Sequence, residues 1–171
     1  MTIAKKRLAS RNKKLKFLVV FYSRTGTTKR LAEAISIVLK CDLEEIREPE
    51  SRSGLLGYLR SGKEAAWKEM PRIMKPIKNP ENYDIVIIGT PVWSATVSSP
   101  VRSYMHENKD KFRRVAFFSS CDVIGGITFY EMAKLCKKKP LAMLEMKTFE
   151  IRKGGYIQKI NDFVKRIEES I

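Results

Sequence analysis

Short apolar runs alternate with longer amphipathic segments along the chain. Three runs, Phe17–Tyr22, Ile85–Ile88 and Val115–Phe118, are rich in β-branched and aromatic residues and carry no charge. Such runs are typical of strands that are buried on both faces. Two further segments, Leu43–Ile46 and Ala142–Ile151, mix apolar residues with charged ones, as strands at a sheet edge do. The pattern therefore predicts five strands, with the second and the fifth at the edges.

Apolar residues recur at helical spacing between and after these strands. The predicted apolar faces are Leu31, Ile35, Val38 and Leu39; Val101, Tyr104 and Met105; Phe129, Met132, Ala133 and Cys136; and Ile157, Ile160, Val164, Ile167 and Ile171. Alternation of strand and helix implies parallel strands, right-handed crossovers and helices on both faces of the sheet. We expect an α/β fold with a doubly wound five-stranded parallel sheet of order 2-1-3-4-5, because this order puts the charged strands at the edges.

The segment Ser51–Pro80 departs from this simple alternation. Glycines and prolines bracket a predicted helix near Lys63–Met70. Tyr58 and Trp67 could cover a ligand or bury a dimer surface, although packing is the more common role of an aromatic residue in a crossover helix.

Charge is distributed unevenly along the 171 residues. The net charge is +15, and seven basic residues without any acid stand in the first sixteen positions, which leaves +8 for the remainder. We therefore divide the chain into a basic N-terminal arm, residues 1–16, and one domain, residues 17–171. The arm could bind nucleic acid or an acidic partner, but it has no interleaved aromatic residue for base stacking. A solvated tail is the favoured interpretation.

Several other classes of protein are disfavoured by the composition. No apolar run approaches the ~18 residues that a membrane helix needs, and no apolar segment opens the chain, so we expect a cytoplasmic protein without membrane insertion. Cys41, Cys121 and Cys136 are too scattered for a disulfide framework and are expected to be free thiols. His106 is the only histidine, which argues against a metal centre and a histidine-based triad.

A hydroxyl-rich turn, Ser23–Thr28, follows the first predicted strand and opens a helix. Unpaired backbone N–H groups at the start of a helix bind anions, and the hydroxyls around them favour phosphate. With Gly26 as its only glycine, the turn fits neither the Walker loop nor the dinucleotide loop. The alternative is an ordinary helix start, in which Thr25 or Thr27 is the cap and Gly26 allows a tight bend.

Two more turns follow the third and the fourth predicted strands. In Gly89–Pro100, Pro91 stiffens the chain and Trp93 can lie flat against a planar ring. Ser119–Gly126 is flexible enough to fold over a ligand. Ligands of doubly wound sheets bind at the carboxyl ends of the strands where the strand order reverses, and all three turns belong to that edge. Each turn alone is also an ordinary strand ending.

The motifs in two of these turns resemble the flavodoxin family. Ser23, Thr25, Gly26 and Thr28 match its phosphate loop, [ST]-x-T-G-x-T, and Tyr83–Trp93 followed by Ser-Pro-Val is similar to the third-strand signature of its short reductase-like members. The resemblance extends from about Lys16 to the C-terminus. It implies non-covalent FMN as the cofactor and no catalytic side chain, since the flavin itself carries the electrons.

The resemblance also implies where FMN lies. The phosphate would be held by Ser23, Arg24, Thr25, Gly26, Thr27 and Thr28; the ring would lie against Pro91, Val92, Trp93, Ser94 and Ala95, with Ser120, Cys121, Asp122, Gly125 and Gly126 on its other side.

Three functions follow as hypotheses. The first is a flavodoxin-like redox protein that passes electrons to a partner protein. The second is an NAD(P)H-dependent reductase of quinones or similar acceptors on the same fold, with a homodimer as one way to complete its site. The third, from another class, is a basic module without flavin that binds nucleic acid or an acidic surface.

Overall fold

The computed structural model describes residues 15–49 and 54–171 and contains a six-stranded sheet. Five strands run parallel in the order β2-β1-β3-β5-β6: β1 Phe17–Phe21, β2 Asp42–Glu45, β3 Ile85–Trp93, β5 Arg114–Cys121 and β6 Met143–Lys147. This order confirms the predicted doubly wound fold. The sixth strand, β4 (Thr96–Val97), was not predicted; it pairs antiparallel with the end of β3.

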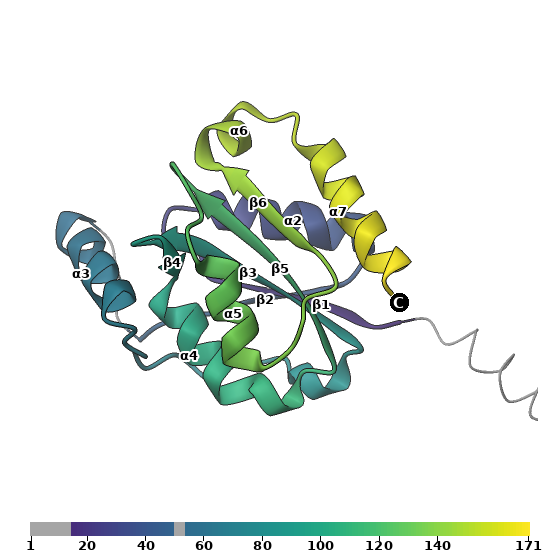
Figure 1. The fold of residues 1–171 in the computed structure, drawn as a ribbon, viewed down its shortest axis with the longest axis horizontal. Helices are drawn as coiled ribbons and strands as arrows, with labels where there is room; N and C mark the ends of the chain where they lie inside the picture. The colour runs from purple at the N-terminus through teal and green to yellow at the C-terminus, as the bar shows by residue number, and fades with distance from the viewer. Residues whose placement is uncertain (1–14, 50–53) are drawn as a thin grey trace, which may run out of the picture.

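Helices cover both faces of the sheet (Figure 1). They are α2 Thr27–Leu39, α3 Gly54–Ala66, α4 Ser99–Asn108, α5 Thr128–Cys136, α6 Thr148–Lys153 and α7 Ile157–Glu169, with short 3₁₀ turns at Pro80–Asn82 and Lys109–Lys111. One hydrophobic cluster joins α2 and α7 to the sheet, and a second joins α4 and α5 to its other face.

Alternate residues of the central strands supply these two clusters. Val19 and Phe21 of β1 point toward α2 and α7, whereas Leu18 and Val20 point to the opposite face, and all four are buried. Complete burial of a large apolar side chain contributes roughly 1.5–3 kcal/mol, so a strand that is buried on both sides accounts for much of the core. The uncharged runs of the sequence are confirmed as the central strands.

The last edge strand is shorter than predicted. The expectation of a strand through Ile151 is wrong, because β6 ends at Lys147 and α6 begins at once. The Glu150 carboxylate accepts the backbone N–H of Lys147 at 3.2 Å, which stabilises the first turn of α6. Gly154, with φ of 80°, ends that helix.

The crossover after β2 also differs from the prediction. The helix α3 begins at Gly54, well before the predicted Lys63–Met70, and ends at Ala66, so the two overlap only over Lys63–Ala66. The glycines that were expected to bracket a helix lie inside it. The following Lys68 has a positive φ of 58°, which no helix continues. The packing role considered for Trp67 is wrong, since this side chain is 74% exposed, and the side chain of Tyr58 lies outside the described residues.

The last helix keeps only the central part of its predicted apolar face. Ile160, Val164 and Ile167 are buried, whereas Ile157 and Ile171 are 52% and 48% exposed. The unpredicted Phe163 completes the buried face of α7.

Residues 1–14 of the predicted basic arm lie outside the described part of the chain. The two described residues of the arm contact the domain: Leu15 packs against the first hydrophobic cluster, and the Lys16 amide donates to the Asp84 carboxylate at 2.9 Å. Within residues 15–49 and 54–171, no helix has both the length and the apolar character that crossing a membrane requires.

Candidate functional site

A cavity of about 500 Å³ lies at the carboxyl edge of the sheet, between the turns that follow β1, β3 and β5. Eleven of the sixteen predicted site residues line it: Arg24, Thr25, Thr27, Thr28, Pro91, Val92, Trp93, Ser94, Ser120, Cys121 and Asp122. Ser23, Gly26, Ala95, Gly125 and Gly126 are not among its lining residues. The three turns therefore meet as expected.

The turn after β1 leaves the start of α2 open. Gly26 is the N-cap residue, with φ of 86°, and no side chain caps the helix. The cap considered for Thr25 or Thr27 is therefore wrong. The Gly26 N–H donates to the Ser23 hydroxyl at 3.1 Å, so Ser23 stabilises the turn rather than lining the cavity. The first backbone N–H groups of α2 have no partner within the helix, which suits the binding of an anion.

Thr28 connects the first turn to the third. Its hydroxyl lies 2.8 Å from that of Ser120, and both residues are buried. This bond fixes the first turn of α2 against the end of β5, so the relative position of the two walls is determined before any ligand binds.

The turn between β3 and β4 is a two-residue hairpin whose central residues are left-handed although neither is glycine. Val92 pairs with Val97 and Trp93 with Thr96, and the two residues between them, Ser94 and Ala95, have φ of 49° and 57°. Left-handed backbone at non-glycine residues costs roughly 1–2 kcal/mol each and persists only where neighbours hold it.

Two hydrogen bonds hold this hairpin. The Ser94 hydroxyl donates to the Gly62 carbonyl of α3 at 2.8 Å, and the Ile127 N–H donates to the Ala95 carbonyl at 2.9 Å. The helix α3 and the start of α5 thus clamp the hairpin from two sides.

Gly125 and Gly126 allow the third turn to approach its neighbours. A Cβ on Gly126 would lie 2.1 Å from the Ala95 carbonyl oxygen, and the residue has φ of +56°. A Cβ on Gly125 would lie 1.7 Å from a carboxylate oxygen of Glu145, at the end of a flexible side chain. Close approach of the backbone is therefore the role of Gly126 in particular.

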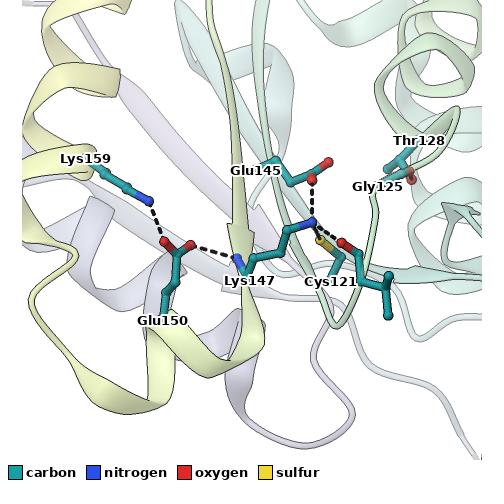
Figure 2. Close-up of polar contacts among 8 residues, drawn as sticks. Cys121, Gly125, Thr128, Glu145, Lys147, Glu150 and Lys159 are labelled. Atoms are coloured by element: carbon teal, nitrogen blue, oxygen red, sulfur yellow. Dashed lines mark hydrogen bonds and ion pairs between the residues drawn. The ribbon is translucent and has the colours of Figure 1, made fainter.

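Cys121 lies in a polar cluster at the end of β5 (Figure 2). Its Sγ is 3.5 Å from Lys147 Nζ, which also contacts the Glu145 carboxylate at 3.2 Å and the Val123 carbonyl. Burial, followed by the nearby Glu145 carboxylate, raises the pKa of the Cys121 thiol despite the lysine. The thiol is therefore protonated at neutral pH, which agrees with its interpretation as a small wall residue.

The ring of Trp93 packs edge-to-face on Tyr22, with ring centroids 5.5 Å apart and planes at 86°. This contact orients the indole at the cavity wall, and such pairs contribute about 0.5–1.5 kcal/mol beyond the buried area. Tyr22 lies behind the wall, at the end of the first apolar run, where sequence reasoning saw only a buried residue.

Six lining residues were missed by the sequence analysis. They come from α3 and α6: Leu59, Ser61, Gly62, Lys63, Thr148 and Arg152. The helix predicted near α3 was misplaced, and α6 was not predicted at all, because most of it fell in the predicted strand Ala142–Ile151. The sequence does contain a helix signal for α6. Glu150 stands three residues after Lys147, as in a capping box, and the pair Gly154–Gly155 can end a helix.

Charge in the cavity is predominantly positive. Arg24, Lys63 and Arg152 line it together with one carboxylate, Asp122. An open helix start, exposed hydroxyls and three cations form an environment for a phosphorylated ligand, and the indole of Trp93 supplies an aromatic wall.

Fold and cavity together define a doubly wound α/β protein with an anion-binding turn where the strand order reverses. The family model described as Flavodoxin matches residues 16–144, so the chain belongs to the flavodoxin family. No curated protein matches the sequence.

Solved structures of flavoproteins share this fold. The flavoprotein of Lactobacillus acidophilus in complex with FMN is 20% identical, with a TM-score of 0.70 over 88% of this chain and 99% of that one. Oxidised flavodoxin 2 of Bacillus cereus is 16% identical, with a TM-score of 0.59 over 91% of this chain and 99% of that one. At these identities the likeness is one of fold.

Proposed function

We propose that the predicted domain, residues 17–171, binds FMN non-covalently in this cavity and transfers electrons through it as a flavodoxin-like redox protein. The observation that carries the proposal is the cavity itself, which has an uncapped helix start on one wall and Trp93 on another. Membership of the flavodoxin family and the FMN complex of the Lactobacillus relative support the cofactor. The proposal includes the cytoplasmic location expected from the sequence.

The chain offers a suitable phosphate end. Thr25 and Thr27 line the cavity beside the open N-terminus of α2, and their hydroxyls are 3.4 Å apart. A phosphate dianion is stabilised there by the helix dipole and by hydroxyl and amide hydrogen bonds. These groups would anchor and orient FMN.

The chain also offers a suitable ring end. Pro91–Ser94 form one wall of the cavity, and Cys121 and Leu59 add apolar surface. Bound flavin supplies the redox chemistry, while the protein excludes water and presents backbone groups to the ring. The clamped hairpin at Ser94 and Ala95 keeps that wall in place.

FMN uptake by the purified apoprotein tests the proposal. Titration should quench flavin fluorescence at a 1:1 ratio, and Gly26→Ala should weaken binding because Gly26 has φ of +86° in the phosphate turn. Gly155→Ala is the matched control, since Gly155 has φ of +77°, has open space around it and is absent from the lining residues. Failure of the unmodified protein to take up excess FMN would refute the proposal.

Turnover distinguishes a carrier from a reductase. The FMN-loaded protein should oxidise neither NADH nor NADPH in the presence of a quinone if it exchanges electrons only with a partner protein. Steady oxidation of either nucleotide would replace the carrier assignment with that of an NAD(P)H-dependent oxidoreductase.

A further inference from the structure

Arg152 lines the cavity from α6, outside the three turns that the family resemblance singles out. We propose that its guanidinium is a ligand of the FMN phosphate and makes the site selective for the phosphorylated flavin. This inference rests on the proposed function and assigns a specificity-determining residue to the same site.

The position of α6 brings Arg152 to the phosphate end. Ile151, the residue before it, is 2% exposed and belongs to the same hydrophobic cluster as Leu31 and Ile35 of α2. The helix α6 also contacts α2 directly, and Arg152 lines the same cavity as Thr27 and Thr28 in the first turn of α2. Thr148, at the start of α6, lines the cavity as well.

Anchors at both ends make α6 a fixed support. Glu150 accepts the Lys147 N–H at 3.2 Å and pairs with Lys159 of α7 at 2.6 Å (Figure 2). The Gly154 N–H donates to the Glu150 carbonyl at 3.1 Å, which closes the last turn. A cation on such a support loses less conformational freedom on binding than one on a free loop.

Of the three cations that line the cavity, Arg152 is the one whose charge has no partner among the described residues. Within residues 15–49 and 54–171, no hydrogen bond or ion pair involves it. By contrast, Lys63 lies over the Trp67 ring, 5.9 Å from its centroid, and Arg24 already interacts with another residue. The guanidinium fork matches two phosphate oxygens, and such charge-assisted bonds are stronger than those of neutral donors.

Binding of FMN and of riboflavin tests the inference, because the two flavins differ only in the phosphate. Arg152→Gln should weaken FMN binding about 10- to 100-fold and leave riboflavin binding unchanged. The dependence of FMN affinity on salt should also decrease in this variant. Lys153→Gln is the control: it removes the same charge from the adjacent position, which does not line the cavity, and should bind both flavins like the unmodified protein.

The outcomes separate this inference from the proposed function. If Arg152→Gln binds FMN like the unmodified protein, or loses FMN and riboflavin equally, Arg152 is not a phosphate ligand although the site binds flavin. If the unmodified protein takes up no FMN, the proposed function itself fails. Circular dichroism melting of both variants checks that the fold is retained.

Discussion

The guanidinium of Arg102 lies 3.3 Å from the carboxylate of Glu131, and the two residues are only 2% and 5% exposed. Arg102 comes from α4 and Glu131 from α5. Lys68, after α3, reaches the same carboxylate at 3.2 Å, and Arg102 also donates to the Thr96 hydroxyl of β4 at 3.4 Å. The buried Glu131 carboxylate and its two cations therefore join α4, α5 and the residues after α3, and Arg102 links them to the hairpin that forms a wall of the cavity.

Removing one partner of this pair should destabilise the domain strongly. Arg102→Met leaves the Glu131 carboxylate buried with only Lys68 beside it, and we expect a loss of about 3 kcal/mol in the free energy of unfolding. Urea denaturation measures this loss. Arg113→Met is the control, because Arg113 pairs with Asp84 at 3.2 Å but is 57% exposed, and less than ~1 kcal/mol is expected. Equal losses in the two variants would contradict a structural role of the buried pair.

The same pair should make stability depend on pH in the acid range. Burial alone would raise the pKa of Glu131, but Lys68 and Arg102 outweigh it and hold the pKa below the ordinary value of 4.5. The ionised form is thus favoured in the folded state, so its contribution is complete above about pH 4.5 and is lost as the pH falls through the lower folded-state pKa. Urea midpoints between pH 7 and pH 3 should show this loss, and Glu131→Gln should reduce it. An unchanged acid slope in Glu131→Gln would refute the assignment.

Gly126→Ala should displace the β3–β4 hairpin. The new methyl group would lie 2.1 Å from the Ala95 carbonyl oxygen, so the hydrogen bond from Ile127 to Ala95 would be broken. We expect a loss of about 2–3 kcal/mol in stability and weaker FMN binding. Gly155→Ala has the same backbone strain without the clash, with an expected loss of ~1 kcal/mol and no effect on flavin. Urea denaturation measures the stability of the two variants, and fluorescence titration measures their flavin binding. If Gly126→Ala and Gly155→Ala gave the same results, the close approach of Gly126 to Ala95 would not be required.

Ala95→Gly should stabilise the protein. Ala95 has φ of 57° in the hairpin, and glycine adopts this conformation without steric cost, so an increase of up to about 1 kcal/mol is expected. Ala133→Gly, in the middle of α5, is the opposite control and should lose about 1 kcal/mol. Thermal melting measures both, and a lower melting temperature for Ala95→Gly would mean that the left-handed turn carries no strain.

The parts of this protein that were predictable are those encoded by neighbouring residues. The uncharged run that begins at Phe17 could only be a buried strand, and the hydroxyl-rich turn after it needed only its own residues to indicate an anion site. The charges in β2 and β6 indicated edge positions, and with alternating helices these were enough for the strand order. The boundaries of the helices were less predictable. The glycines of α3 resemble helix breakers, yet Gly62 lies inside the helix and accepts the Ser94 hydroxyl at 2.8 Å.

By itself, the sequence determined the doubly wound architecture and the edge of the sheet where the three turns meet, because hydrophobic period and turn chemistry act over a few neighbouring positions. The family resemblance of its motifs indicated eleven of the residues around the cavity. Only the tertiary structure decided that Arg152 and Lys63 join that cavity, that Gly126 must pass close to Ala95, and that Arg102 is buried against Glu131. These relationships join residues that are distant along the chain, and packing of the helices on the sheet brings them into contact.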